Sequence, residues 1–194
     1  MFYLMGLTGQ FIIICWITFI VYWVANSFSN KRTALKSGWE NWNWRLPIFI
    51  AIFLLIVFSR GGSGKYLGST LWHKTLAVGL LADLITLSGI TLAFWARKII
   101  AGNWSSNIVI KENHELVQNG PYAYIRHPIY SGMFLMMLGA AIISGRLGAF
   151  LIFIIFFSSL WFKASQEEKL LIRHFPDSYP QYKAKTKKFI PFIF

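Results

Sequence analysis

Five apolar runs restrict the fold of this chain more than any other feature of its sequence. They are Tyr3–Ala25, Leu46–Phe58, Leu76–Ala96, Tyr130–Ser144 and Leu147–Phe162. A helix crosses a bilayer with about 20 mostly apolar residues, and the first and third runs reach that length. Because hydrocarbon offers no partners to backbone polar groups, the spans must be helical. We therefore predict an all-α, polytopic membrane bundle with about five transmembrane helices.

The shorter runs have flanking residues that are typical of membrane spans. Three tryptophans within Trp39–Trp44 precede Leu46–Phe58 and would anchor it at the interface. Only Gly145 and Arg146 separate the last two runs, and one continuous helix would leave Arg146 in hydrocarbon. These two runs are therefore predicted to form a tight helical hairpin over residues 130–162.

The distribution of charge predicts how the chain is oriented in the membrane. Of the 19 Lys and Arg residues, fifteen fall in the first and third loops and the C-terminal tail, and four fall on the opposite side. The positive-inside rule then predicts that the N-terminus is outside and the C-terminus is cytoplasmic. This bias accounts for the net charge of +12 without nucleic acid as a partner. The basic tail is expected to contact anionic membrane lipid.

The segment His114–Gly132 is polar between apolar runs and is the first candidate site. It gathers aromatic and basic side chains within nine residues: Tyr122, Tyr124, Arg126, His127 and Tyr130. Pro121 and Pro128 each fix the backbone angle φ, so the segment is expected to be rigid. An aromatic belt at the membrane interface is the alternative explanation. Such a belt requires neither a His-Pro pair nor two prolines, so we favour a binding site.

A second polar segment, Lys163–Arg173, begins where the last apolar run ends. Its adjacent carboxylates, Glu167 and Glu168, would lie at the cytoplasmic edge of the bilayer. We expect them to hold cationic or hydroxyl groups of a ligand, although a solvated amphipathic helix explains the same pattern. No metal site is expected, because His114 is followed by Gln118 where the helical zinc motif needs a second histidine.

Three segments resemble the isoprenylcysteine carboxyl methyltransferase family of membrane methyltransferases. They are ARKIIAGNW (96–104), HELVQNGPYAYIRHPIYSG (114–132) and SQEEKLLIRHFPDSYPQYKAK (165–185), and together they extend over the C-terminal half of the chain. We accordingly divide the chain into residues 1–96, with three transmembrane helices, and residues 97–194. The second part is expected to be the cofactor-binding catalytic region, with the hairpin 130–162 and the cytoplasmic tail.

The resemblance implies an S-adenosylmethionine site in a pocket at the cytoplasmic face. The implied cofactor contacts are His114, Glu115, Leu116, Val117, Tyr122, His127, Pro128, Ile129, Tyr130 and Glu167, with Asn107 as a looser candidate. Two cations, Arg97 and Lys163, are implied as catalytic residues on the substrate side, and we add Glu168 to the substrate contacts. Lys163 replaces an arginine of the family, and a lysine cannot bind a carboxylate through two parallel hydrogen bonds.

The implied reaction is methyl transfer from S-adenosylmethionine to the carboxylate of a prenylated cysteine or a similar lipid-linked acid. Two alternatives remain open. A phospholipid N-methyltransferase would need a base to deprotonate its ammonium nucleophile, and Glu168 or Glu115 would serve. A protein similar to the sterol reductases would need a nicotinamide site, and the chain contains no GxGxxG sequence.

Overall fold

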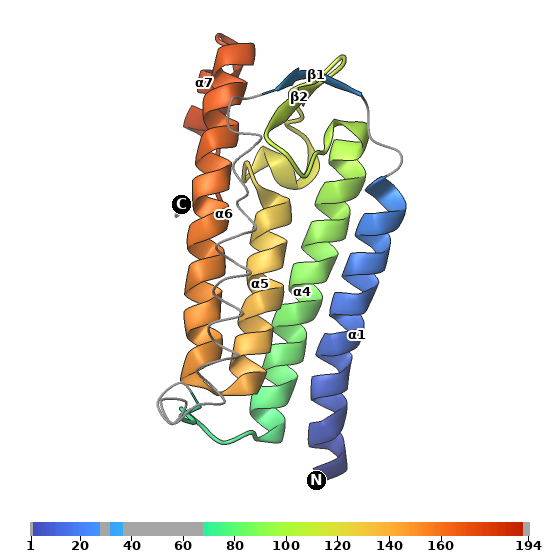
Figure 1. Ribbon diagram of the computed structural model, residues 1–194, viewed down its shortest axis with the longest axis vertical. Coiled ribbons are helices and arrows are strands. Elements are labelled where there is room, and N and C mark those ends of the chain that lie inside the picture. The colour runs from blue at the N-terminus through green and yellow to red at the C-terminus, as the bar shows by residue number, and fades with distance from the viewer. Residues whose placement is uncertain (1, 28–31, 37–67, 192–194) are drawn as a thin grey trace.

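The computed structural model describes residues 2–27, 32–36 and 68–191. Within them, four long helices run side by side in the order α6, α5, α4, α1 (Figure 1). Their bounds are Phe2–Ser27 (α1), Leu76–Ile100 (α4), Pro128–Ser144 (α5) and Leu147–His174 (α6). The shorter elements are the strands Thr33–Lys36 (β1) and Val109–Lys111 (β2), the 3-10 helices Ala101–Asn103 (η1) and Gly120–Ala123 (η2), and the helix Ser178–Lys185 (α7).

Among the described residues, three helices are long and apolar enough to cross a membrane, which agrees with the predicted class of protein. These candidate spans are Leu7–Asn26, Leu76–Asn103 and Leu147–His174. The apolar helix α5 is shorter, with 17 residues, and it turns directly into α6 as the predicted hairpin. The predicted span Leu46–Phe58 lies outside the described residues, so the count of about five spans stays a prediction.

Helix α6 continues to His174, well beyond Phe162, where the last apolar run ends. The segment Lys163–Arg173 is thus helical, as the amphipathic-helix interpretation expected: its charged residues are good helix formers, and Lys163 pairs with Glu167 one turn later. A helix of 28 residues extends about 42 Å, whereas the hydrocarbon core is about 30 Å thick. The polar last turns of α6 therefore project beyond the core.

The described residues are mostly helical, as predicted, and β1 and β2 add a small antiparallel sheet that the sequence did not indicate. Thr33 lies opposite Lys111, and Lys36 lies opposite Val109. Neither strand has the length or the alternating pattern that identifies a strand in sequence. The pairing joins the chain after α1 to the loop after α4, so it depends on a long-range contact.

Helices α4 and α5 pack so closely that glycine is required between them. A Cβ atom on Gly89 would lie 2.6 Å from the carbonyl oxygen of Gly132, and a Cβ on Gly132 would lie 2.5 Å from that of Gly89. Small residues at a helix contact allow this approach in membrane bundles. The contact fixes α5 against α4, and His127 directly precedes the first turn of α5.

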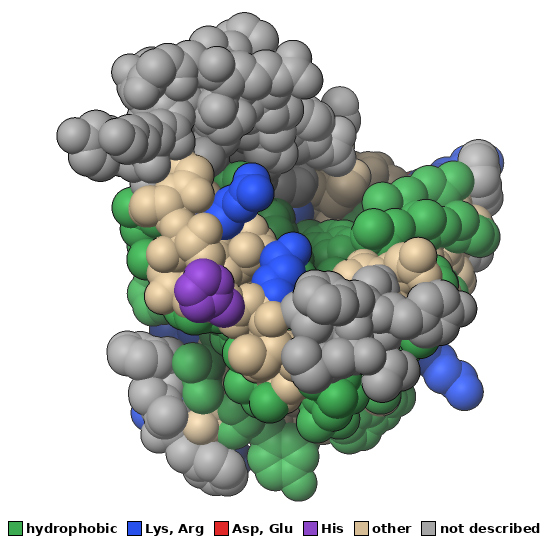
Figure 2. Space-filling view, turned by 90° about the horizontal axis from the view of Figure 1, so that it is seen from below, with side chains coloured by type: hydrophobic (Ala, Val, Ile, Leu, Met, Phe, Trp, Pro, Cys, Tyr) green, Lys and Arg blue, Asp and Glu red, His purple; other side chains and the backbone are tan. Residues whose placement is uncertain are grey.

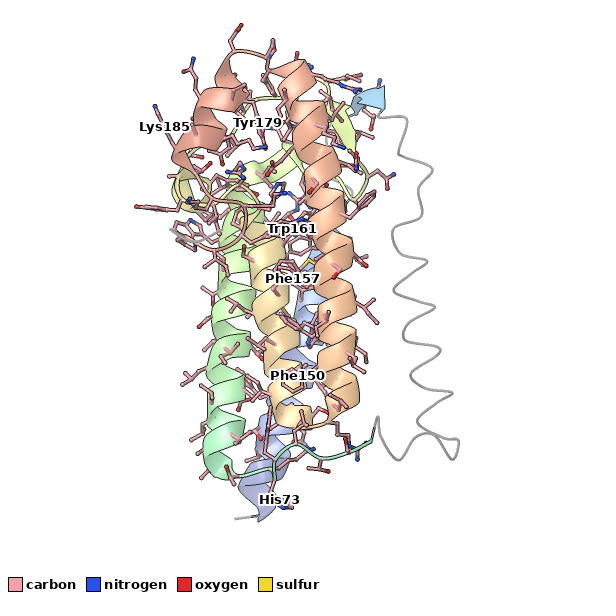
Figure 3. All side chains as sticks on the ribbon, turned by 90° about the vertical axis from the view of Figure 1, so that its left-hand side faces the viewer. His73, Phe150, Phe157, Trp161, Tyr179 and Lys185 are labelled. Atoms are coloured by element: carbon pink, nitrogen blue, oxygen red, sulfur yellow. The ribbon has the colours of Figure 1, made fainter. Side chains whose placement is uncertain are left out.

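The two ends of the bundle differ in their polar side chains. Tyr179 and Lys185 lie at one end and His73 lies at the other (Figure 3). The end with His73 faces the viewer in Figure 2, where a few basic side chains lie among apolar and neutral ones. Lys74 and Arg146 are exposed near this end. The expected functional boundary after Ala96 falls inside α4 and stays a prediction.

Candidate active site

A pocket lies at the end of the bundle that carries α7 and the small sheet. Its walls come from the end of α4, the loop through β2, the start of α5, the last turns of α6, and α7. Nine of the ten predicted cofactor residues line it: His114, Glu115, Leu116, Val117, Tyr122, His127, Ile129, Tyr130 and Glu167. Asn107 also lines it. Pro128 is buried and does not line the pocket. It is the first residue of α5 and lies between the lining residues His127 and Ile129.

Local sequence explains how His127 and Tyr130 come to face the same cavity. Pro128 occupies the first turn of α5, where its missing N–H costs no hydrogen bond. His127 is the residue that caps this helix, and Tyr130 follows three positions later. The two rings are parallel within 1°, with centroids 5.4 Å apart. The His-Pro pair thus places one imidazole and one phenol as a stacked wall.

The Glu167 carboxylate lies among the side chains of Tyr130, Lys163 and His127. The Tyr130 hydroxyl donates a hydrogen bond of 2.7 Å to Glu167 Oε1. Lys163 Nζ lies 3.6 Å from the same oxygen, and His127 Nδ1 lies 3.6 Å from Oε2. The Glu167 side chain retains 18% exposure and lines the pocket. Its carboxylate is therefore held in place and accessible to a bound cation.

Glu168 has different surroundings, although it is the next residue. Its side chain is 4% exposed, and its carboxylate lies 2.9 Å from Arg126 Nε, 3.0 Å from Lys183 Nζ and 3.3 Å from His127 Nε2. It does not line the pocket. With three basic partners it joins α6 to α7 and to the segment before α5. Its predicted contact with substrate stays a prediction, and the geometry favours a structural role.

The two predicted substrate-side cations are both buried, on different helices and outside the pocket lining. Arg97, on α4, donates a hydrogen bond of 2.9 Å to the Asn26 carbonyl, and its guanidinium lies 5.0 Å from the centre of the Trp104 ring. Lys163, on α6, lies 5.2 Å from the centre of the Tyr130 ring. Lys163 thus contacts two pocket residues directly, and Arg97 contacts one.

Burial disfavours ionisation of the tyrosines of the pocket. It raises the pKa values of Tyr122, Tyr179 and Tyr182 well above the usual value for a phenol. The Tyr182 hydroxyl donates to the Tyr122 carbonyl at 2.7 Å.

The Tyr179 hydroxyl is buried and has no hydrogen-bond partner among the described residues. Asn103 Oδ1, in the wall after α4, is likewise buried without a described partner. Sequence reasoning did not select Tyr179 or Asn103 as site residues.

The C-terminal segment Thr186–Phe189 supports the pocket from behind. The backbone N–H of His127 donates to the Lys188 carbonyl at 3.1 Å, and the Ser131 hydroxyl donates to the Phe189 carbonyl at 2.6 Å. The Arg126 guanidinium donates to the carbonyl of Thr186. Sequence reasoning treated this segment only as a basic tail. The sole local signal was an apolar residue, Phe189, after a run of lysines.

These features define a class of protein: a polytopic helical membrane protein with a charged and aromatic pocket at one end of its bundle. Residues 81–173 match the model of the isoprenylcysteine carboxyl methyltransferase family. The resemblance expected from the sequence is thus confirmed, and it is carried by the region that builds most of the pocket.

Two curated relatives are both called protein-S-isoprenylcysteine O-methyltransferase. The one from Schizosaccharomyces pombe is 41% identical over 100 residues, which are 48% of this chain and 41% of the relative. The one from Saccharomyces cerevisiae is 34% identical over 133 residues, which are 62% of this chain and 54% of the relative. The chain therefore spans about half the length of these relatives.

A solved structure has a similar fold. It is the structure of the eukaryotic intramembrane Ras methyltransferase ICMT, with a TM-score of 0.53 and 20% sequence identity. The similarity covers 79% of this chain and 53% of the solved chain. At this identity the likeness concerns the fold, and it agrees with the membrane bundle described above.

Proposed function

We propose that this protein transfers a methyl group from S-adenosylmethionine to the carboxylate of a prenylated cysteine or a similar lipid-linked acid. The observation that carries the proposal is that nine of the cofactor residues implied by the resemblance line one pocket. Eight of them lie within residues 114–130, and the fold brings the distant Glu167 of α6 to the same cavity. The names of the matching relatives support the same reaction.

The side chains of the pocket suit the chemistry of S-adenosylmethionine. The cofactor carries a sulfonium and an α-ammonium group, and Glu167 offers an accessible carboxylate in the wall. The lining also contains the aromatic rings of Trp104, Tyr122 and Tyr130, and an aromatic face attracts cations by about 1–2 kcal/mol when water is excluded. Aliphatic residues of β2 and α6 line the rest of the pocket and provide apolar contact.

The proposed reaction requires little acid–base catalysis by the protein. When bound, the cofactor supplies an electrophilic methyl group on sulfur. An acceptor carboxylate is already ionised at neutral pH, so no side chain has to remove a proton. The protein must align the reactants and exclude water, and alignment alone can supply roughly 7–11 kcal/mol. In this proposal Lys163 and Arg97 attract and orient the acceptor carboxylate.

The surroundings of Glu168 argue against the phospholipid alternative. An ammonium nucleophile must lose a proton before it attacks, and Glu168 was one of two predicted bases. Its carboxylate is engaged by Arg126, Lys183 and His127, which stabilise its ionised form and occupy its oxygens. This leaves Glu115, an exposed residue of the lining, as the predicted base for that reaction.

The pocket end is proposed to face the cytoplasm. The exposed cations of α7 and the following residues, Lys183, Lys185 and Lys187, lie at this end, whereas Lys74 and Arg146 lie at the other. An excess of cations marks the cytoplasmic side of membrane proteins. A soluble cofactor would then enter from water, and a prenyl chain would approach through the bilayer beside the helices.

Methyl transfer by the detergent-purified protein tests the proposal. The protein receives methyl-labelled S-adenosylmethionine together with farnesylated N-acetylcysteine, its methyl ester, or phosphatidylethanolamine. We expect label on the free acid, release of that label by base, and none on the ester, whose carboxylate is blocked. Base-stable label on the phospholipid would instead establish N-methylation. Failure to label any acceptor while the cofactor binds would refute the proposed acceptor class.

A further inference from the structure

Asn103 is a polar residue of the pocket whose role nothing above explains. It ends η1, directly after α4, and it is 8% exposed. It lines the pocket, and its Oδ1 atom has no hydrogen-bond partner within the described part of the chain. A buried amide oxygen left without a donor is costly, by about as much as the hydrogen bond it lacks. Its burial also makes glycosylation of the sequence Asn-Trp-Ser at this position unfavourable.

The wall around Asn103 differs in charge from the wall built by α5 and α6. The pocket residues between 100 and 108 are Ile100, Asn103, Trp104, Ser105, Asn107 and Ile108, and none of them is ionisable. The wall built by α5 and α6 contains His127 and Glu167. Asn103 follows α4 and Glu167 lies on α6, and α5 lies between these two helices (Figure 1), so the two walls come from different parts of the bundle.

This difference sets the direction in which a cofactor fits. The charged groups of S-adenosylmethionine are in its methionine portion, which the wall with Glu167 suits. Its nucleoside is neutral and is left for the wall with Asn103. Among neutral nucleoside groups, the 6-amino group of adenine is a donor that an asparagine side-chain oxygen accepts with good geometry, as asparagine does with adenine in DNA.

We propose that Asn103 Oδ1 accepts a hydrogen bond from the 6-amino group of the cofactor's adenine and makes the pocket selective for that base. This assignment rests on the proposed function, because it takes S-adenosylmethionine as the occupant. It adds a specificity-determining residue that belongs to a different element of the pocket wall from Glu167.

The test compares two ligands on two proteins. S-adenosylhomocysteine and S-inosylhomocysteine, in which an oxygen replaces the 6-amino group, are titrated calorimetrically into the wild type and into Asn103→Leu. We expect the wild type to prefer the adenine ligand by about tenfold or more. In the inosine ligand the 6-oxygen is an acceptor and would lie against Asn103 Oδ1, which is also an acceptor. Asn103→Leu should lose that preference and bind both ligands with similar affinity.

Leucine is chosen because it fills the same space without an unpaired polar atom. Removing that atom should leave the thermal midpoint of unfolding unchanged or raised, so a loss of base preference would not reflect a damaged fold. Asn119→Leu is the matched control, since Asn119 is exposed and outside the pocket lining, and it should keep the wild-type preference.

Each other outcome has a separate meaning. Equal affinity of the wild type for both ligands, or an equal preference in Asn103→Leu, would overturn the assignment of Asn103 and leave the proposed function standing. If the wild type binds neither S-adenosylhomocysteine nor S-adenosylmethionine, the proposed function itself fails, and the assignment fails with it.

Discussion

Glu167 and Glu168 are adjacent in sequence but have different surroundings. The Glu167 side chain is 18% exposed and faces the pocket, whereas that of Glu168 is 4% exposed and lies among three basic side chains. Successive residues of a helix point about 100° apart, so one step turns the carboxylate from a cavity to a packed interface. The two residues are therefore expected to have separable roles, ligand binding for Glu167 and stability for Glu168.

Exchanging each carboxylate for an amide measures this difference. Glu167→Gln should weaken the binding of S-adenosylmethionine at least tenfold, because a charge-assisted contact becomes a neutral one, and should change the unfolding midpoint little. Glu168→Gln should lower the free energy of unfolding by about 3 kcal/mol or more, since it leaves the buried Arg126 guanidinium without its counter-charge. Calorimetric titration and thermal unfolding in one detergent provide both readouts. Matching effects of the two variants on both quantities would contradict the division of roles.

At this scale the sequence predicts which residues meet but not how each is used. The His-Pro pair and the paired glutamates mark the pocket because such residues are unusual beside apolar spans. The partners of Glu168 come from positions 126, 127 and 183, and only the folded chain brings them together. The burial of Asn103 and Tyr179 has no local sequence signal either.

Among the elements, the close glycine contact between α4 and α5 fixes the position of α5, and the first turn of α5 carries residues of the pocket. Gly132→Ala would bring a Cβ within 2.5 Å of the Gly89 carbonyl oxygen, so the two helices must move apart. We expect a loss of about 1–3 kcal/mol in the free energy of unfolding, with weaker cofactor binding because α5 carries Tyr130. Gly9→Ala in α1 is the control, since no atom lies within 4 Å of its added Cβ. Equal thermal stability of the two variants would show that the close contact is not required.

The C-terminal segment is a second element whose effect is testable. The Phe189 ring is buried and lies 5.1 Å from the ring of Phe134 and 5.8 Å from that of His127, centre to centre. Phe189→Ala should cost about 3–5 kcal/mol of stability, as for other buried aromatic residues. Ile190→Ala, at the next and 45% exposed position, should cost under about 0.5 kcal/mol. Chemical unfolding of both variants provides the comparison, and a small loss for Phe189→Ala would exclude a supporting role for this segment.

Helices are the elements that sequence predicts best here. Apolar length predicted α1 and α4 to within a few residues, and Gly145, with φ of 62°, ends α5 as a left-handed cap. For α6 the apolar run Leu147–Phe162 covers only part of the helix, because hydropathy marks the edge of the bilayer rather than the end of a helix. The β1–β2 pairing was missed because its strands are short and lie far apart in sequence.

For the whole molecule, the proposed function requires the pocket to face the cytoplasm, where the cofactor would enter. This orientation is tested by accessibility of single cysteines after replacement of Cys15 with alanine. Lys74→Cys and Lys185→Cys are exposed positions at opposite ends of the bundle. A membrane-impermeant maleimide applied to intact cells should label the first, and the second should react only after the membrane is opened. The reverse pattern would place the pocket outside the cell.

The central claim is that this pocket binds S-adenosylmethionine. The most direct test is photo-crosslinking of the labelled cofactor to the wild-type protein, followed by mapping of the modified peptides, with excess S-adenosylhomocysteine as competitor. If this pocket binds the cofactor, we expect label that the competitor removes, on peptides that contain residues 114–117, 127–130 or 167. Label confined to other parts of the chain, or label that the competitor does not remove, would contradict it.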